Sequence, residues 1–400
     1  MNILILANKP PYPAKDGSSL ATLGMATGLS KLGNRVTVLA ISTPKHPCKI
    51  EQIPIVLKEL IDFNLVYINT RPNPFKGIYN LLFSKWPYSI ERFINHRYSH
   101  KLAEIIKANR FDIIQIEGLY IAPYLKIIKR LSNTPIVFRS HNIEHEIWSR
   151  ISMNEKNWVK AKYFVLLSKR IRRMETKISD HVDALVAISK RDEQWFVSNG
   201  FNKPSISIPS GYPSSGLTNI TGLSNNDICY LGSLDWIPNQ EGLNWFLDKV
   251  WPKIFRTFPD LTFHIAGRNA PTSIIERLKK EKRVIFHGEV ESSQEYLKNY
   301  SILVVPILSG SGMRVKIVEG MMLGKAIVTT TIGIEGIDAI NHEHVIIADT
   351  PDDFTNAIDE LIHQPRYKAS IAEKARIFAM GHFDDLKITE ELEVFYKRLI

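Results

Sequence analysis

Short apolar runs alternate along the chain with segments in which apolar residues recur every three or four positions. An apolar run between two helical segments is typical of a strand in a parallel sheet that helices cover on both faces. The pattern therefore predicts an α/β protein. The predicted strands are NILILA (2–7), RVTVLAI (35–41), FDIIQIE (111–117), PIVFRSH (135–141) and ALVAIS (184–189), and then ICYLGS, LTFHIAG, VIFHGEV, ILVVPI, AIVTTT and HVIIAD after residue 227.

A stretch rich in glycine, serine, proline and asparagine, residues 209–227, separates the two series of strands. That composition is typical of a hinge linker, and a chain of 400 residues exceeds one typical core. We predict two doubly wound domains, over residues 1–208 and 228–383. Residues 384–400 are predicted to form a helix that crosses back and packs on the first domain through Ile388, Leu392, Phe395 and Leu399.

The composition narrows the class of protein. No apolar run is long enough for a transmembrane helix, and the first residues lack the basic region of a signal peptide. Cys48 and Cys229 lie far apart and lack the spacing of metal ligands, which indicates a reducing compartment. We expect a cytoplasmic protein.

The charge is unevenly distributed. Residues 1–200 carry 30 Lys and Arg against 16 Asp and Glu, a balance of +14, whereas the rest of the chain carries 21 and 25, a balance of −4. Basic, amphipathic segments over 74–93 and 156–178 suit an anionic membrane surface or a lipid diphosphate, so a peripheral position on the inner face of the membrane is one hypothesis. Solvated basic helix faces are the alternative. No nucleic-acid-binding motif is present, so no nucleic-acid partner is expected. The second segment places Val159, Tyr163, Leu167, Ile171, Met174 and Ile178 on one face.

The stretch SGSGMRVKIVEGMML, which follows a predicted strand, carries the clearest chemistry. Gly310 and Gly312 let the backbone approach a ligand, and the N-terminus of the next helix favours phosphate. Arg314 and Lys316 add positive charge, and the Glu319 carboxylate suits sugar hydroxyls. Together they fit a nucleotide sugar. The alternative is a surface helix with a Lys316–Glu319 ion pair.

The pattern PILSGSGMRVKIVEGMMLGKAIVTT resembles the signature of retaining glycosyltransferases of family 4, which have the GT-B fold. Other segments resemble parts of that family in the same order: NKPPYPAKDGSS, RSHNIEHEIW, LVAISKRDEQWF, SIPSGY, YLGSLDWIPNQEGLNWFL and VIFHGEV. The resemblance spans nearly the whole chain. It implies two Rossmann-like domains facing across a cleft, the first for the acceptor and the second for a nucleotide-diphosphate sugar donor.

The resemblance also assigns roles to residues. It implies that His141, at the end of a predicted strand, contacts the donor sugar near the reacting carbon, with Glu144 either orienting His141 or capping the next helix. Asp16 is interpreted as a turn residue. The catalytic set is His141, Glu319, Arg314 and Lys316, and the donor-binding set is Gly17, Gly310, Ser311, Gly312, Met313, Gly232, Gly267 and Val290.

Two departures from the family pattern bear on the mechanism. The first of two glutamates eight positions apart is replaced by Ser311, and Ser233 stands where the family often has arginine, with no lysine following it. We infer that Arg314 and Lys316 supply the missing charge at the diphosphate. Because no D-x-D triplet occurs, we expect no metal and no other cofactor.

The sequence therefore predicts a retaining, metal-independent glycosyltransferase of the hexosyltransferase type. It would transfer a sugar from a nucleotide donor to a glycan or lipid-linked glycan in surface polysaccharide or glycoconjugate biosynthesis. Two alternatives stay open. One is a GT-B nucleotide-sugar epimerase, and the other, suggested by Ser311, is a non-catalytic partner subunit that binds nucleotide sugars.

Overall fold

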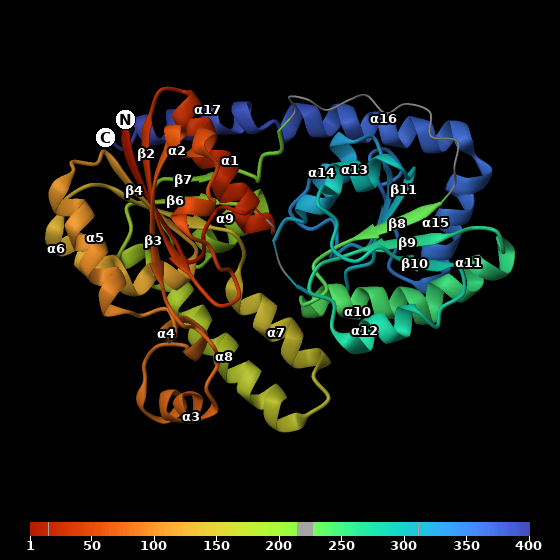
Figure 1. Ribbon diagram of the computed structural model, residues 1–400, viewed down its shortest axis with the longest axis horizontal. Coiled ribbons are helices and arrows are strands. Elements are labelled where there is room, and N and C mark those ends of the chain that lie inside the picture. Colours follow the sequence, from red (N-terminus) through yellow and green to blue (C-terminus); the bar gives the residue numbers. More distant parts are fainter. Residues whose placement is uncertain (15, 214–226, 311) are drawn as a thin grey trace. The chain divides into compact units, whose positions relative to one another are not determined.

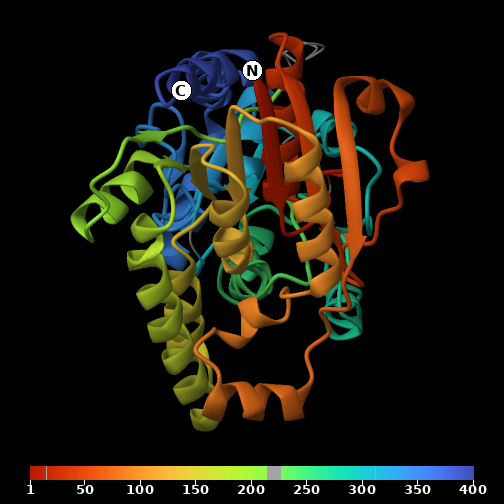
Figure 2. The same cartoon turned by 90° about the vertical axis from the view of Figure 1, so that its left-hand side faces the viewer.

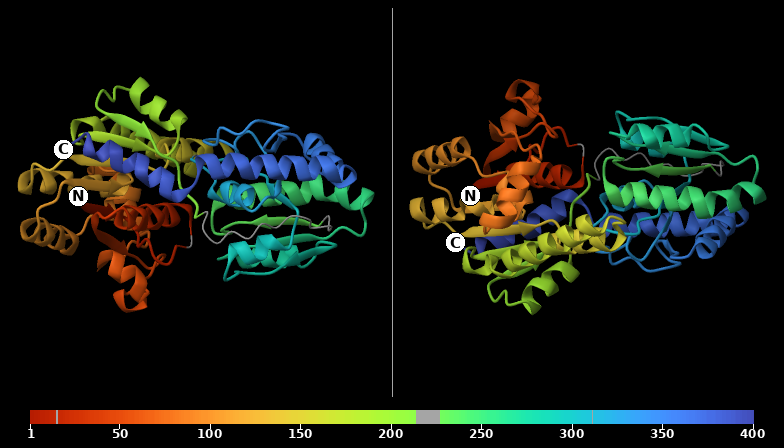
Figure 3. Two further views of the ribbon diagram at one scale, coloured as in Figure 1. Left: turned by 90° about the horizontal axis from the view of Figure 1, so that it is seen from above. Right: turned by 90° about the horizontal axis from the view of Figure 1, so that it is seen from below.

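The structure, a computed structural model, describes residues 1–14, 16–213, 227–310 and 312–400 (Figure 1). The chain forms two compact units: unit 1 comprises Met1–Gly211 and Asp385–Ile400, and unit 2 comprises Tyr212–Asp384. Each unit has one parallel sheet with helices on both faces (Figures 1 and 3). The predicted α/β class with two Rossmann-like domains is confirmed. Most of the predicted hinge linker, residues 214–226, lies outside the described residues.

Unit 1 contains a seven-stranded sheet with the order β3-β2-β1-β4-β5-β6-β7. Helices cover both faces of the sheet, and the apolar side chains of its central strands form one core together with those of the helices and loops. The strands are β1 (Asn2–Ala7), β2 (Arg35–Ser42), β3 (Ile61–Tyr67), β4 (Ile113–Glu117), β5 (Ile136–Ser140), β6 (Ala184–Ala187) and β7 (Ser205–Ser207). The helices are α1 (Gly17–Lys31), α2 (Ile55–Leu60), α3 (Pro74–Phe83), α4 (Tyr88–Glu91), α5 (His96–Ala108), α6 (Leu125–Leu131), α7 (Glu144–Asn154), α8 (Trp158–Thr176), α9 (Lys190–Ser198) and α17 (Asp385–Lys397), with 3-10 turns η1 (Ile50–Gln52), η2 (Leu119–Tyr124) and η3 (Ile178–Asp180).

Unit 2 contains a six-stranded sheet with the order β10-β9-β8-β11-β12-β13 and a core of its own. The strands are β8 (Ile228–Leu231), β9 (Phe263–Ala266), β10 (Val284–Phe286), β11 (Ile302–Val305), β12 (Ala326–Thr329) and β13 (Ile346–Ile347). The helices are α10 (Ile237–Trp245), the π-helical turn η4 (Phe246–Val250), α11 (Trp251–Thr257), α12 (Thr272–Leu278), α13 (Ser293–Lys298), α14 (Val315–Met322), α15 (Pro351–His363) and α16 (Pro365–His382).

The strand order places a topological switch point in each sheet. In unit 1 the chain builds outward from β1 on one side and then returns to add β4 on the other side, and in unit 2 β8 and β11 are related in the same way. Ligands of doubly wound sheets bind outside the carboxyl ends of the strands at such a point. The loops that follow β1 and β4, and those that follow β8 and β11, are therefore the places where each unit can form a site.

The last helix, α17, packs on α1 in unit 1, as predicted. Gly28 allows the close approach, because a Cβ atom there would lie 2.4 Å from Thr389 Oγ1. Asn34 Nδ2, in the turn that follows α1, donates to Glu393 Oε1 of α17 at 2.8 Å. Three of the four predicted apolar positions are buried, whereas Leu399 lies beyond the helix end and is half-buried; Thr389 and Tyr396 are buried in addition.

Three features differ from the sequence analysis. β3 was not predicted, because Asp62 and Asn64 interrupt the apolar run of an edge strand whose side chains are alternately exposed. β7 was not predicted because it is only three residues long. Val159, which the sequence analysis places on one face with Leu167 and Ile171, is 56 % exposed, because the first turns of α8 extend past the core that those two residues join.

Candidate active site

In unit 2, four of the predicted donor-binding residues lie in loops at the carboxyl edge of the sheet. Gly232 follows β8, Gly267 follows β9, Val290 lies after β10, and Gly310 lies after β11. The backbone is closely packed here, since a Cβ atom on Gly267 would lie 2.4 Å from the carbonyl oxygen of Gly232. The structure thus brings together loops that are separated by up to 78 positions in the sequence.

Lys316 reaches back from the first turn of α14 to the loop after β8. Its Nζ donates to Asn239 Oδ1 at 2.9 Å and lies 4.9 Å from the centre of the Tyr230 ring. A side chain at Gly232 would displace the Lys316 amine, because a Cβ atom there would be 2.8 Å from Nζ. Burial, and then the charge of Arg314, lower the pKa of Lys316 to about 7. Among the described residues no carboxylate pairs with Lys316, so an anion placed against Nζ would favour its protonated form.

Arg314 is the N-cap residue of α14 and follows a loop with two left-handed glycines. Gly310 has φ +100° and Gly312 has φ +84°, conformations that residues with a side chain rarely adopt. Arg314 Nη1 donates to the Gly312 carbonyl, so the guanidinium folds over the loop. Met313 lies half-buried beside it, and Ser311 lies outside the described residues.

Glu319 lies on α14 and is buried. Its Oε1 accepts hydrogen bonds from Tyr212 Oη at 2.8 Å and from Ser293 Oγ, and Gln294 Nε2 donates to the same Tyr212 oxygen at 2.9 Å. Burial raises the pKa of Glu319, and these two hydroxyls partly offset the effect. The alternative of a Lys316–Glu319 ion pair is excluded in this structure, because each side chain has other partners. Tyr212 and Ser293 are neighbours that the sequence analysis did not identify.

The sequence analysis also missed Arg268, a third cation at the carboxyl edge of this sheet. Its Nε donates to Ser233 Oγ at 3.0 Å, and Ser233 Oγ donates to Asp235 Oδ1 at 2.6 Å. Ser233 occupies the position where the family often has arginine, so an arginine from the next strand's loop lies beside that position. The signal was available, since Arg268 directly follows Gly267 at the end of a predicted strand.

In unit 1, His141 follows β5 and faces the last residue of β4. Its Nε2 lies 2.5 Å from Glu117 Oε2, which also accepts from Thr22 Oγ1 at 3.0 Å and lies 3.7 Å from Arg139 Nη1. Burial raises the pKa of Glu117, but the charges of Arg139 and His141 and the hydrogen bonds from His141 and Thr22 outweigh this effect, so the pKa is lowered overall. Glu117 is thus a buried carboxylate that orients the His141 imidazole.

A chain of buried polar side chains continues from Glu117 to the last helix. Gln115 Nε2 donates to Glu117 Oε1, and Tyr396 Oη donates to Gln115 Oε1. All three side chains are almost completely buried, and burial raises the pKa of Tyr396 far above its usual value. His141 is therefore connected to α17 by hydrogen bonds through Glu117, Gln115 and Tyr396. We call this chain of hydrogen bonds the buried relay.

The other predicted residues of unit 1 lie at the N-termini of helices. Glu144 begins α7, where its backbone N–H donates to Glu175 Oε1 at 2.6 Å, and burial together with Glu175 raises its pKa to about 7. Gly17 is the first residue of α1, and Asp16 is its N-cap, accepting from the Ser19 N–H at 3.0 Å. Asp16 is therefore more than a turn residue.

Family models match both units. The model described as Glycosyltransferase Family 4 matches residues 16–214, and the model described as Glycosyl transferases group 1 matches residues 225–364. The chain belongs to these glycosyltransferases.

Individual proteins resemble this glycosyltransferase over its full length. A protein of Klebsiella pneumoniae, described as an uncharacterized 44.6 kDa protein in cps region, is 26% identical over 96% of this chain and 97% of its own length. Among solved structures, Anabaena HepE in complex with UDP-glucose has a TM-score of 0.70 at 16% identity and covers both chains completely. Sucrose-phosphate synthase of Thermosynechococcus elongatus has a TM-score of 0.71 at 14% identity, covering 100% of this chain and 99% of its own. These similarities confirm the GT-B fold.

In the described part of this glycosyltransferase, no helix has both the length and the apolar character to span a bilayer. Within residues 1–14, 16–213, 227–310 and 312–400, no group of three or more His, Cys, Asp and Glu side chains is arranged to hold a metal ion.

Proposed function

We propose that this glycosyltransferase transfers a sugar from a nucleoside-diphosphate sugar bound by unit 2 to a hydroxyl of a glycan or lipid-linked glycan held by unit 1. The proposal rests on the position of Lys316, whose half-buried amine lies beside Gly232 at the switch point of the unit 2 sheet. Anabaena HepE, which shares the fold, has been solved with UDP-glucose. A UDP-sugar is therefore the first donor to test.

The cations of unit 2 would stabilise the diphosphate as it leaves the sugar. As the bond between the anomeric carbon and the diphosphate oxygen breaks, negative charge develops on that oxygen. Arg314 and Lys316 are placed at the first turn of α14, whose free N–H groups add a further positive field. Fixed cations in a half-buried site stabilise such charge without reorganisation. We propose that they act without a metal ion.

The residues of unit 1 suit the sugar and the acceptor. We propose that His141, oriented by Glu117, donates a hydrogen bond to the transferred sugar and stabilises charge near its anomeric carbon. The acceptor oxygen bonds to that carbon on the face that the diphosphate leaves, and the acceptor's proton passes to the departing diphosphate. This course retains the configuration of the sugar and needs no protein nucleophile.

The biological setting of the proposal is surface polysaccharide or glycoconjugate biosynthesis. The Klebsiella pneumoniae relative is described by its place in a cps region, which supports this setting. A lipid-linked acceptor agrees with the surplus of +14 over residues 1–200 and with a position on the inner face of the membrane.

Turnover of nucleotide sugars with a mixture of acceptors tests the proposal. A first panel of thermal melts identifies the nucleotide sugar that stabilises the protein, since a ligand that binds only the native state raises its melting temperature. That donor is then incubated with acceptors, and the anomeric configuration of the product is read by proton NMR. A glycoside of retained configuration is expected. An epimerised donor would favour the epimerase, and binding without turnover would favour a non-catalytic partner subunit.

A further inference from the structure

The helix α3 presents its apolar residues away from unit 1. Five of its ten residues have large hydrophobic side chains that are 59 to 83 % exposed: Phe75, Ile78, Tyr79, Leu82 and Phe83. An amphipathic helix of a globular protein normally turns such residues toward the core. Here the one buried residue of the helix is polar, Asn80.

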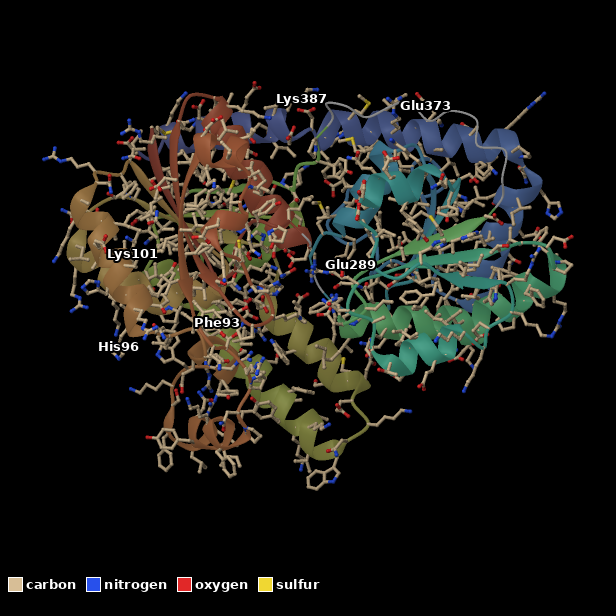
Figure 4. All side chains as sticks on the ribbon, in the orientation of Figure 1. Phe93, His96, Lys101, Glu289, Glu373 and Lys387 are labelled. Atoms are coloured by element: carbon tan, nitrogen blue, oxygen red, sulfur yellow. The ribbon has the colours of Figure 1, made fainter. Side chains whose placement is uncertain are left out.

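Polar contacts hold α3 in this orientation. Asn80 Nδ2 donates to the Trp86 carbonyl at 2.9 Å and to Glu91 Oε2 at 2.7 Å. Arg170 of α8 donates to the Leu81 carbonyl at 2.8 Å. In contrast, the ring of Phe93, which follows α4, packs 5.1 Å from the ring of Tyr120 beside the core (Figure 4). The outward face of α3 is therefore fixed by its own backbone and amide contacts.

The corner between α7 and α8 adds to this apolar surface. Met153, Trp158 and Val159 are each more than half exposed, and Lys162 Nζ lies 4.9 Å from the centre of the Trp158 ring. Figures 1 and 2 both show α3 and this corner at the same end of unit 1. We call the exposed apolar residues of α3 and of the α7–α8 corner the apolar end.

The charges around the apolar end are almost all positive. Residues 69–88 and 156–174 contain ten Lys and Arg residues and no Asp or Glu. The carboxylate at the corner, Glu155, accepts a hydrogen bond from the Asn157 N–H at 2.8 Å. Exposed aromatic and aliphatic side chains interleaved with cations match the interface of a bilayer that carries anionic lipids.

We propose that the apolar end docks on an anionic membrane surface, with the face of α3 inserted at the level of the headgroups. A second copy of the chain is the less favourable occupant. In a twofold dimer the same surface would meet itself, and the cations of one copy would face those of the other. The inference deepens the proposed lipid-linked acceptor, and it rests on exposure and charge that are independent of turnover.

Sedimentation with lipid vesicles tests the proposal on the full-length protein. The protein is mixed with vesicles of phosphatidylcholine alone and of phosphatidylcholine with phosphatidylglycerol. We expect it to sediment with the anionic vesicles at low salt, and less as salt screens the attraction. The double variant Phe75→Ser/Leu82→Ser should bind at least tenfold more weakly. The matched control is Ile377→Ser, an exposed apolar residue on α16 of unit 2, which should bind like the wild type.

Each result supports or overturns the docking surface. Because Phe75 and Leu82 are exposed, both variants should melt at the temperature of the wild type, which checks their folding. Vesicle binding that is equal for the double variant and the wild type would overturn the proposal. Failure of the wild type to bind anionic vesicles would also overturn it, and self-association that the double variant abolishes in analytical ultracentrifugation would then identify a second copy as the occupant. Turnover with a soluble acceptor is measured in parallel, so that failure of docking and failure of the proposed function remain distinct.

Discussion

Lys316 is expected to take up a proton when the protein binds an intact nucleotide sugar. In the free protein burial and Arg314 lower its pKa to about 7, so that about half of the molecules carry a neutral amine at pH 7. A diphosphate placed against Nζ favours the ammonium form. Binding above pH 7 therefore requires protonation. A nucleotide sugar is the appropriate probe because its diphosphate has no group that titrates near neutrality.

The size of the effect follows from the pKa. About half a proton should be taken up per ligand at pH 7 and about nine-tenths at pH 8, with affinity falling about tenfold for each pH unit above that. The stability of the free protein, in contrast to the affinity, should increase with pH. Because the folded-state pKa lies below the unfolded value, the Lys316 contribution to stability is greatest at high pH. It is lost as pH falls from about 10.4 to about 7.

Calorimetry measures the number of protons taken up when the ligand binds. The nucleotide sugar that gives the largest thermal shift is titrated into the protein at about pH 8 in Tris and in HEPES, whose ionisation enthalpies differ. The difference in observed heat gives the protons taken up. Lys316→Arg is the control, since an arginine remains charged throughout this range and should bind without uptake. Equal heats in the two buffers for the wild type, or the same uptake in Lys316→Arg, would refute the placement of Lys316 at the diphosphate.

Three further predictions concern the buried relay, the Glu319 site and metals. Tyr396→Phe removes the hydroxyl that donates to Gln115 Oε1, so it should lower the free energy of unfolding, measured in urea, by about 1–3 kcal/mol. It should also shift the pH profile of kcat, and an unchanged profile would contradict a role of the buried relay in catalysis. Glu319→Gln should lower kcat/KM for the donor at least tenfold, which corresponds to about 1.4 kcal/mol. Tyr212→Phe should cause a smaller loss. Wild-type kinetics in both variants would show that the Glu319 carboxylate only supports the fold. Turnover should survive EDTA, and loss that Mn²⁺ or Mg²⁺ restores would contradict the metal-free proposal.

The fold was largely predictable because central parallel strands are continuous apolar runs. The strands β1 and β11 are buried on both faces, so their sequences signal a strand without any tertiary knowledge. The edge strand β3 gives a weaker signal because polar residues alternate along it. The length and position of α17 were also predictable, since its apolar spacing follows one helix face. The polar contacts of Tyr396 on that helix were not.

The candidate site was predictable where its residues are contiguous. The loop and helix from Gly310 to Glu319 carry their chemistry in ten consecutive positions. Glu117 was missed because it closes a strand whose apolar pattern hides a carboxylate, and its partner His141 lies 24 positions away. Tyr396 and Gln115 are 281 positions apart, so only the folded chain brings them together.

The division of unit 1 into two stretches of chain has a consequence for synthesis on the ribosome. Unit 2 is continuous from Tyr212 to Asp384, and its two ends are already joined by the hydrogen bond from Tyr212 N–H to the Phe383 carbonyl. Unit 2 can therefore complete its fold as soon as it emerges. Unit 1, although made first, lacks the partner of Gly28 and Gln115 until the last sixteen residues follow. The usual order, in which the N-terminal domain folds first, is reversed for its final step, and a chain that stops before Asp385 would carry a finished unit 2 attached to an unfinished unit 1.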